Sequence, residues 1–433
     1  MELLYDNLAI NEAGHLTVGG VDAVYLAEKY GTPLYVLDED KIRQNCRLYT
    51  KNMAEQFGEG SLPLFAGKSL CFKGLYRVIE EEGMCADVVS PGELYTALAA
   101  GFPPERLFFH GNNKTDEDIR YGVDSGVGYF VADNYNELDI LNAYAGEKGI
   151  RQKVLLRVTP GIDSHTLEAI NTGKVDCQFG SPIETGQAAR FVKKALAKEN
   201  LDIQGYHFHI GSQIFDIEPF CRAVNILLNF ALEIRSELGF TARIFNLGGG
   251  FGVRYADSDP QIDIPANIRA LAEHLKEACT KCQYPLPRIY MEPGRSIVGN
   301  AGLTLYTVGG VKPIEGYRSY VTVDGGMTDN PRYALYKAKY TVLPAGLMND
   351  AADFTCTIAG RCCESGDLIQ EHVTLPEPHR SDILAVLTTG AYNFSMSSNY
   401  NRLCRPAIVM VSGGQNRPAV RRQTFEDLVA CDL

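Results

Sequence analysis

The feature that most narrows the possible folds is an alternation of short apolar runs with helical stretches between residues 41 and 292. Eight of the runs have strand length, and stretches with apolar residues three and four apart separate most of them. The runs end at Lys68, Val89, His110, Val131, Arg157, His209, Leu247 and Glu292. Eight such units over roughly 250 residues predict an α/β fold, a closed (β/α)8 barrel of the TIM type. A doubly wound sheet is the rival, but no dinucleotide-binding fingerprint supports it.

A second pattern begins after Ser296, where short β-rich runs are separated by glycine and proline. These runs cover residues 303–308, 320–323, 340–343, 354–358 and 408–411. They are typical of a β-sandwich or a small β-barrel. Because residues 1–40 also contain strand-like pieces, we expect them to join this C-terminal β domain. The prediction is therefore a barrel domain of residues 41–296 inserted into a β domain of residues 1–40 and 297–433.

Composition limits the partners and the compartment. The net charge is −12 and no basic run occurs, which argues against a nucleic-acid partner. No apolar stretch reaches membrane-spanning length, and the N-terminus lacks the basic start of a signal peptide. The 12 cysteines are scattered through a long chain, as expected for reduced thiols in the cytoplasm. Cys279 and Cys282 have metal-like spacing, but they lie in a helical stretch without a second pair, so we expect no metal.

Lys68 is the first candidate for chemistry. It ends the apolar run that begins at Leu62, and helical spacing begins at Ser69. In a barrel of this kind, the carboxyl ends of the strands carry the chemistry. A lysine there can be partly desolvated, which lowers its pKa and supplies a neutral amine that attacks a carbonyl group. The alternative is a solvated loop lysine.

Three further strand ends carry groups that suit a phosphorylated aromatic cofactor. Gly248, Gly249 and Gly250 can present backbone N–H groups to a phosphate, although a plain tight turn is the alternative. His209 can stack on an aromatic ring and Ser212 can bind phosphate, although His209 also suits a polar core position. Glu292 can keep a pyridine nitrogen protonated, and Arg295 can hold a carboxylate, although the two can also form a structural ion pair.

Taken in order, the motif segments resemble the fold-type III, alanine-racemase-like pyridoxal phosphate decarboxylases, in particular their diaminopimelate-specific branch. The resemblance runs from about Tyr35 to Leu403. Its segments are residues 65–68, 87–94, 110–114, 157–161, 209–213, 248–250, 292–296, 323–327, 363–367, 390–392 and 395–401. Each segment alone is weakly specific, whereas the ordered set is highly specific.

The resemblance implies a role for each candidate residue. Lys68 would form the Schiff base with pyridoxal 5'-phosphate, His209 would stack on its ring, and Glu292 would pair with the ring nitrogen. Asp87 would lie near the cofactor. The implied phosphate-binding set is Ser212, Gly248, Gly249, Gly250, Gly294 and Tyr392. Cys363 would be the proton donor, and the implied substrate-binding set is Arg295, Arg332, Tyr336, Glu364 and Tyr392, with Arg295 also next to the cofactor.

The implied reaction is decarboxylation of meso-2,6-diaminopimelate to L-lysine and CO2, the last step of lysine biosynthesis. The family also implies a homodimer whose active sites are shared, with Cys363 and Glu364 coming from the partner subunit. The alternatives are a related decarboxylase acting on ornithine, arginine or carboxynorspermidine, or a non-catalytic interaction protein of the same fold. A racemase is disfavoured, because racemases of this class place arginine, not glutamate, at the ring nitrogen.

The chain departs from the family pattern at two places. Leu70 stands where the lysine motif of the family has asparagine, so any hydrogen bond of that asparagine is lost. The stretch from His165 to Gly173 follows its family counterpart only loosely. Neither place contains a residue with an assigned role, so the expected reaction is unchanged.

Overall fold

The computed structural model describes residues 3–162 and 174–433; the stretch from His165 to Gly173 lies outside the described residues. The chain forms two compact units. One, the barrel unit, comprises Cys46–Gly252 and Ile262–Gly294. The other, the β unit, comprises Met1–Asn45, Val253–Gln261 and Arg295–Leu433. The β unit therefore includes a short segment, Val253–Gln261, from within the range that the sequence pattern assigned to the barrel.

The barrel unit contains a closed ring of eight parallel strands, as predicted. Their order around the ring is β9, β11, β12, β13, β5, β6, β7 and β8, and β8 pairs with β9 to close it. The strands are β5 (Leu62–Ala66), β6 (Cys85–Val88), β7 (Leu107–Phe109), β8 (Tyr129–Ala132), β9 (Gln152–Thr159), β11 (Leu201–His207), β12 (Ile244–Asn246) and β13 (Arg288–Met291). A short strand, β10 (Ser181–Pro182), pairs with β9 outside the ring. Each strand ends within two residues of its predicted end, and the difference is two residues for β5, β9 and β11.

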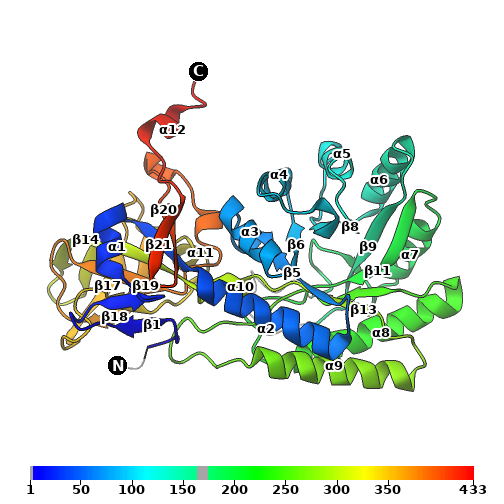
Figure 1. Ribbon diagram of the computed structural model, residues 1–433, viewed down its shortest axis with the longest axis horizontal. Helices are drawn as coiled ribbons and strands as arrows, with labels where there is room; N and C mark the ends of the chain where they lie inside the picture. The colour runs from blue at the N-terminus through cyan, green and yellow to red at the C-terminus, as the bar shows by residue number, and fades with distance from the viewer. Residues whose placement is uncertain (1–2, 163–173) are drawn as a thin grey trace. The chain divides into compact units, whose positions relative to one another are not determined.

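Helices lie around the outside of these strands (Figure 1). They are α2 (Glu39–Phe57), α3 (Lys73–Glu81), α4 (Pro91–Ala99), α5 (Asp116–Asp124), α6 (Tyr135–Glu147), α7 (Gln187–Leu196), α8 (Glu218–Leu238) and α9 (Ile264–Lys281). Helix α4 begins after Ser90, whose side chain accepts a hydrogen bond from the Glu93 N–H. The reciprocal bond of a capping box does not form, because the Glu93 carboxylate accepts the N–H of Val89 instead.

A cluster of buried side chains from strands on all sides of the barrel fills its interior. Phe108 and Tyr129 stack with ring centroids 4.3 Å apart, and Tyr290 lies 5.1 Å from Phe108. The cluster is completed by Leu64, Cys85, Val131, Leu155 and Ile244. Because these residues precede the carboxyl ends of their strands, polar side chains at the strand ends are left to face the mouth of the barrel.

The β unit is built on a mixed nine-stranded sheet. Its strands are β4 (Leu34–Asp38), β14 (Gly302–Pro313), β15 (Ser319–Val323), β16 (Val342–Pro344), β17 (Phe354–Ala359), β18 (Leu368–Leu375), β19 (Ile383–Leu387), β20 (Ala407–Ser412) and β21 (Gln415–Val420). The N-terminal strand β4 lies between β14 and β20, so the N-terminal segment joins the C-terminal β domain as predicted. Strands β1 (Leu8–Ile10), β2 (Leu16–Val18) and β3 (Val21–Asp22) form a separate small sheet.

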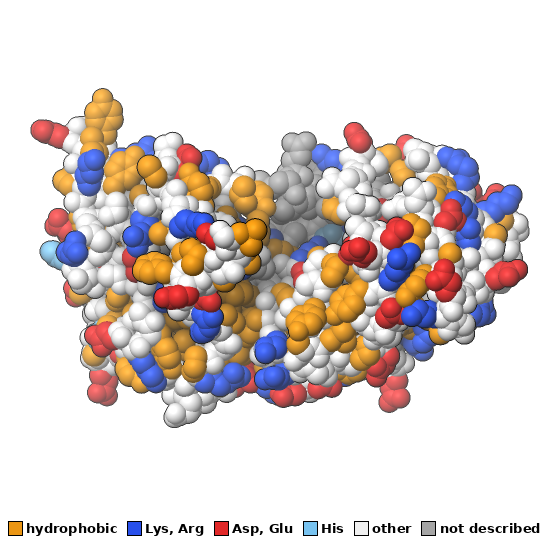
Figure 2. All heavy atoms as spheres, turned by 90° about the horizontal axis from the view of Figure 1, so that it is seen from above, with side chains coloured by type: hydrophobic (Ala, Val, Ile, Leu, Met, Phe, Trp, Pro, Cys, Tyr) orange, Lys and Arg blue, Asp and Glu red, His pale blue; other side chains and the backbone are white. Residues whose placement is uncertain are grey.

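The β unit also contains helices that the strand-like reading of its sequence missed. Helix α1 (Ala23–Tyr30) begins at Asp22, whose side chain accepts the N–H groups of Val24 and Tyr25. Three short helices are α10 (Arg295–Val298), α11 (Arg332–Tyr336) and α12 (Phe425–Val429). Within the described residues, no helix is both long and apolar enough to cross a membrane. On the face in Figure 2, basic and acidic side chains are interspersed.

Candidate active site

A cavity of about 300 Å³ lies at the carboxyl ends of the barrel strands. Its wall carries an unusual density of ionisable side chains from six of the strand ends: Lys68, Asp87, His110, Arg157, His207, His209 and Glu292. Val89, Gly111, Asn112 and Phe179 complete it. Four predicted cofactor residues of the barrel, Lys68, Asp87, His209 and Glu292, therefore share one cavity, whereas Ser212 is not among its lining residues.

Lys68 follows β5 in a single turn of 3-10 helix, Gly67–Ser69. The preceding glycine is required there, because a Cβ atom at Gly67 would lie 2.6 Å from the Tyr76 hydroxyl and 2.8 Å from the Asp87 carbonyl oxygen. The Gly67 N–H donates to Asp87 Oδ1 at 3.0 Å. The expectation that Lys68 is desolvated is wrong in this structure: its side chain is exposed, because the cavity that it lines opens to solvent.

Two carboxylates lie close enough to Lys68 to interact with its charge. Burial raises the pKa of Asp87 to about 6 and that of Glu93 to about 7, and Lys68 opposes both shifts. Both groups therefore exchange protons near neutral pH beside the candidate amine. Asp87 was predicted to be near the cofactor. Glu93 was missed, because its position in the sequence indicates only a helix start.

Glu292, one residue beyond β13, is surrounded by N–H donors. Its Oε1 accepts a hydrogen bond from Asn246 Nδ2 at 2.7 Å and lies 3.1 Å from His110 Nε2. Its Oε2 lies 3.2 Å from His207 Nε2. Burial alone would raise the pKa of Glu292, but His207 and His110 outweigh burial and hold this pKa well below its usual value. Burial lowers the pKa of His207 to about 4, so His207 is a neutral donor to an ionised Glu292 at pH 7.

The ligand atoms of His110, His207 and Glu292 all lie within 4.8 Å of one another, a spacing that a metal ion would also accept. Of these contacts, His207 hydrogen-bonds to Glu292, and His110 Nε2 approaches the same carboxylate as an ion-pair contact. These three residues are the one group of three or more possible metal ligands in residues 3–162 and 174–433. Cys279 and Cys282 therefore lie in no such group. Burial raises the pKa of Cys279 to about 11, which keeps it a thiol, and the Cys282 thiol donates to the Ala278 carbonyl.

The glycine loop after β12 packs against two other strand-end segments. A Cβ at Gly248 would lie 2.4 Å from the Phe208 carbonyl oxygen, and one at Gly249 only 2.0 Å from the Glu292 carbonyl oxygen. Glycine is therefore required for the three backbones to approach. The Gly249 N–H donates to His209 Nδ1 at 3.3 Å, which fixes the imidazole ring. Burial lowers the pKa of His209 well below its usual value, so this ring is a neutral acceptor.

The barrel cavity fits the predicted cofactor in its donor set. It combines a primary amine, a neutral imidazole held by the glycine loop and a carboxylate kept ionised by N–H donors. These are the groups needed to bind the aldehyde carbon, the ring face and the ring nitrogen of pyridoxal phosphate. Lys68 and His209 would hold the first two, and Glu292 the third.

In the β unit, Arg295 and Arg332 form a second cluster with aromatic side chains. Both arginines are 6% exposed. Arg295 donates to the Tyr255 hydroxyl at 2.6 Å, and Arg332 donates to the Tyr340 hydroxyl at 2.7 Å. The Arg295 guanidinium also lies 4.7 Å from the centroid of the Tyr392 ring. Burial alone would raise the pKa of Tyr255, but the two arginines outweigh it and lower the pKa.

Cys363 and Glu364 lie on the loop between β17 and β18, where both are exposed. The Cys363 N–H donates to Asn401 Oδ1 at 2.7 Å. Asp367, which is buried, accepts the N–H groups of Cys362 and Met327 and so ties this loop to a neighbouring one. The remaining predicted residues are half-buried Ser212 and Tyr336 and buried Gly294.

The structure thus brings Lys68, Asp87, His209 and Glu292 together in the barrel unit, and Arg295, Arg332 and Tyr392 in the β unit. Cys363 and Glu364 lie apart from both groups, on their own loop. Motif reasoning missed several residues of the barrel group: His110, Arg157, His207 and Asn246. Each stands at or just beyond a strand end, within or beside a motif segment, and this was the only available signal. Nothing local distinguished these polar residues from others in the same segments.

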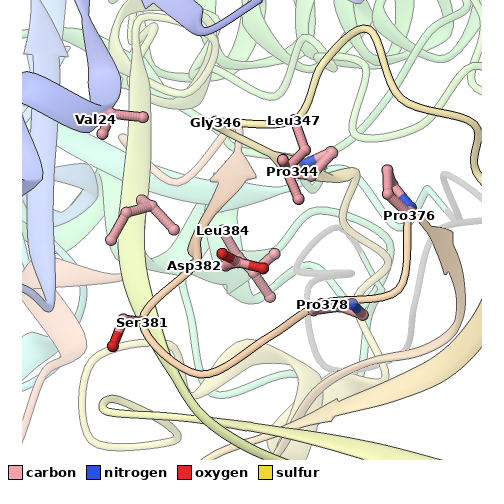
Figure 3. A pocket seen from close by; sticks show the side chains of 10 residues that line it. Val24, Pro344, Gly346, Leu347, Pro376, Pro378, Ser381, Asp382 and Leu384 are labelled. Carbon is pink, nitrogen blue, oxygen red and sulfur yellow. The ribbon is translucent and has the colours of Figure 1, made fainter.

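A further cavity, of about 140 Å³, lies within the β unit (Figure 3). Its wall is mainly apolar, with Pro344, Leu347 and Leu384 among the side chains drawn. Asp382, the charged side chain in this wall, is already engaged, since it accepts the N–H of His379 at 2.6 Å. This cavity lacks the amine and the imidazole of the barrel cavity, so it does not suit the same cofactor.

Comparisons with known proteins bear on both groups. A family profile described as "Pyridoxal-dependent decarboxylase, pyridoxal binding domain" matches residues 39–299. The diaminopimelate decarboxylase of Bacillus subtilis is 46% identical over 423 residues, which are 98% of this chain and 96% of that one. That of Bacillus methanolicus is 44% identical over 414 residues, 96% of each chain. A crystal structure of diaminopimelate decarboxylase from M. jannaschii in complex with L-lysine superposes with a TM-score of 0.90 at 34% identity, covering 100% of this chain and 99% of that one.

Proposed function

The chain belongs to the diaminopimelate decarboxylases of the pyridoxal-dependent decarboxylase family, and from this we propose that it converts meso-2,6-diaminopimelate to L-lysine and CO2. This reaction is the last step of lysine biosynthesis. The cofactor is pyridoxal 5'-phosphate. The observation that carries the proposal is the barrel cavity, in which Lys68 and Glu292 line the same wall. L-lysine in the related crystal structure agrees with lysine as the product.

In the barrel unit, each proposed residue has a distinct task. When bound, the cofactor supplies an electron sink for the negative charge left at Cα as CO2 departs. Lys68 would hold the cofactor through its amine. Glu292 would face the ring nitrogen, and the donors around its carboxylate keep it ionised for that task. His209 supports the ring face.

Asp87 and Glu93 would serve proton exchange at Lys68. Their pKa values are raised by burial into the range where a carboxyl group can give or take a proton near pH 7. Asp87 is already oriented by the N–H of Gly67 next to the lysine. The phosphate would be bound by backbone and hydroxyl donors of Ser212, Gly248, Gly249, Gly250, Gly294 and Tyr392.

The β unit would recognise the end of the substrate that does not react. Arg295 and Arg332 are charged, buried and held by tyrosine hydroxyls, which is a suitable arrangement for a carboxylate. Glu364 would pair with the distal ammonium group, and Tyr336 would complete the site. Cys363 would deliver a proton to Cα. An ornithine or arginine decarboxylase has no distal carboxylate to bind, so paired arginines favour diaminopimelate.

Two measurements test this function on the purified chain. CO2 release should be fastest with meso-diaminopimelate in a panel that includes ornithine, arginine and carboxynorspermidine. Borohydride reduction followed by peptide mapping should place the cofactor on Lys68, and the Lys68→Ala variant should carry no label. A label on a different lysine, or CO2 release from ornithine alone, would refute the assignment.

We further propose that the active chain is a homodimer in which each site takes Cys363 and Glu364 from the partner subunit. Both residues are exposed on a loop of the β unit and so are accessible to a second copy. The scattered cysteines predict a cytoplasmic enzyme, because its exposed thiols, including Cys363 and Cys431, would need a reducing compartment.

Mixing two inactive variants tests the shared site. Lys68→Ala and Cys363→Ala each inactivate both sites of their own homodimer. With random subunit exchange, half of the dimers are mixed and each has one intact site, so about a quarter of wild-type activity should return. Cys431→Ala, which changes another exposed cysteine, should be active alone. If a tagged subunit proves exchange and no activity returns, the site is built within one chain.

A further inference from the structure

Asn246 occupies a position between the two ends of the proposed cofactor site. It is the last residue of β12 and is 0% exposed. Its Nδ2 donates to Glu292 Oε1 at 2.7 Å, and its Oδ1 accepts the N–H of Gly248 at 3.0 Å. Because the backbone N–H of Gly248 can only donate, the orientation of the amide is determined: the oxygen faces the loop and the nitrogen faces Glu292.

A third hydrogen bond closes a triangle. The Glu292 N–H donates to the Gly248 carbonyl oxygen at 2.8 Å. Asn246, Gly248 and Glu292 are thus joined pairwise, two bonds through the amide side chain and one through the backbone. Gly248 has a φ of +65°, in the left-handed region, and its N–H is fixed by this amide. A displacement of the Glu292 carboxylate is therefore transmitted to the first glycine of the loop.

Asn246 differs from the two histidines that also contact Glu292. His110 and His207 can change protonation state, whereas an amide donates its N–H at every pH. Removing either histidine leaves the triangle intact, whereas removing Asn246 breaks two of its three bonds. The amide is thus the one side chain of the three that reaches both the ring-nitrogen carboxylate and the glycine loop.

We infer that Asn246 is a positioning residue that couples the ring-nitrogen end of the cofactor site to its phosphate-binding loop, so that both ends are formed together. The inference rests on the proposed roles of Glu292 and of Gly248–Gly250. Asn246 does not react; it holds Glu292 and Gly248 at the distance that one cofactor molecule requires. Cofactor affinity, rather than turnover alone, should therefore report the loss of Asn246.

The test uses Asn246→Asp in the full-length chain. This variant keeps the oxygen that accepts the Gly248 N–H but places a carboxylate against Glu292. Two carboxylates in contact cannot both remain charged, so one proton must be shared at a cost that grows with pH. Other groups that act on the charge of Glu292 are unchanged in the variant: His110, His207, His209, Asp87 and Arg157.

The readout is the dissociation constant of pyridoxal 5'-phosphate, titrated into the cofactor-free chain and expressed as the ratio of variant to wild type. At pH 8, Asn246→Asp should weaken binding on the order of ten- to a hundredfold. The ratio should fall as the pH is lowered to about 5.5, where the shared proton is bound. Asn246→Ala should weaken binding by a similar factor at every pH. Asn267→Asp, the same change in the first turn of α9, should give a ratio of one.

A swapped pair provides the sharpest control. In Asn246→Asp with Glu292→Gln, donor and acceptor exchange places, so the pH dependence of the ratio should vanish even if turnover is lost. A ratio within twofold of one at pH 8, or an equal and pH-independent loss in the Asp and Ala variants, would overturn the inference. If the wild-type chain binds no cofactor, the proposed function fails and this inference fails with it. If the wild type binds cofactor and Asn246→Asp matches it, only this inference fails.

Discussion

Replacing Lys114 with methionine should destabilise the barrel unit in a pH-dependent way. Lys114 Nζ lies 2.7 Å from Glu137 Oε1, and both side chains are 1% exposed. The ammonium group also donates to the carbonyl oxygens of Gly111 and Val131, at 2.8 and 2.9 Å. Methionine retains the volume and removes the charge and all three contacts, leaving Glu137 buried with the Asp133 N–H as a partner.

The expected magnitude follows from these contacts. Removing one partner of a buried ion pair costs about 3–5 kcal/mol, because the remaining charge is uncompensated. Burial raises the pKa of Glu137, and Lys114 opposes that shift, so Lys114→Met raises the pKa further. The folded state then binds more protons than the unfolded state, so stability is lost as the pH rises through the raised pKa. Below the ordinary glutamate pKa, the cost should fall to about 1–3 kcal/mol, from the two orphaned carbonyl groups.

The assay is urea unfolding at pH 5 and pH 8, followed by far-UV circular dichroism because the chain contains no tryptophan. Hydrogen exchange of peptides from β7 and β8 localises the effect to the barrel. Lys194→Met, which breaks the exposed pair with Asp139, is the matched control and should cost at most about 1 kcal/mol. Adding Glu137→Gln to Lys114→Met should recover part of the loss. If Lys114→Met lowers the free energy of unfolding by less than about 1 kcal/mol at pH 8, or by the same amount at pH 5 and pH 8, the reasoning is refuted.

Three other changes have defined outcomes. Glu93→Gln should flatten the fall in stability between pH 4.5 and 7, because burial raises the pKa of Glu93 to about 7 and the folded state holds its proton. Thermal melts should find the variant about 3 kcal/mol more stable than wild type at pH 8 and equal to it at pH 4. Gly249→Ala should lower the free energy of unfolding by about 3 kcal/mol and abolish cofactor binding in an absorbance titration, because its Cβ would lie 2.0 Å from the Glu292 carbonyl oxygen. The control Gly92→Ala in α4 should leave the stability unchanged or raise it. Glu364→Gln should lower kcat/KM for diaminopimelate ten- to a hundredfold, corresponding to about 1.5–3 kcal/mol, with the cofactor spectrum unchanged; wild-type kinetics would remove Glu364 from the substrate site.

Local patterns were sufficient to predict the barrel and the edge at which its polar residues gather. Strand and helix periodicity is a property of neighbouring residues, and parallel strands in a closed barrel all end at the same rim. Lys68, Asp87, His209 and Glu292 could therefore be expected near one another, although they are spread over more than two hundred residues. Where a local signal was ambiguous, prediction failed: residues 1–40 contain strand-like pieces, yet Ala23–Tyr30 is a helix.

The partners of each charged group depended on the register between strands, which no local pattern contains. Glu292 meets His110, His207 and Asn246 because β7, β11 and β12 end at matching heights around the ring. The same register exposes Lys68 to the cavity and buries Asp87 beside it. Burial and hydrogen bonding, which set protonation states, arise only when segments distant in sequence are packed together, so these properties were decided by the tertiary structure.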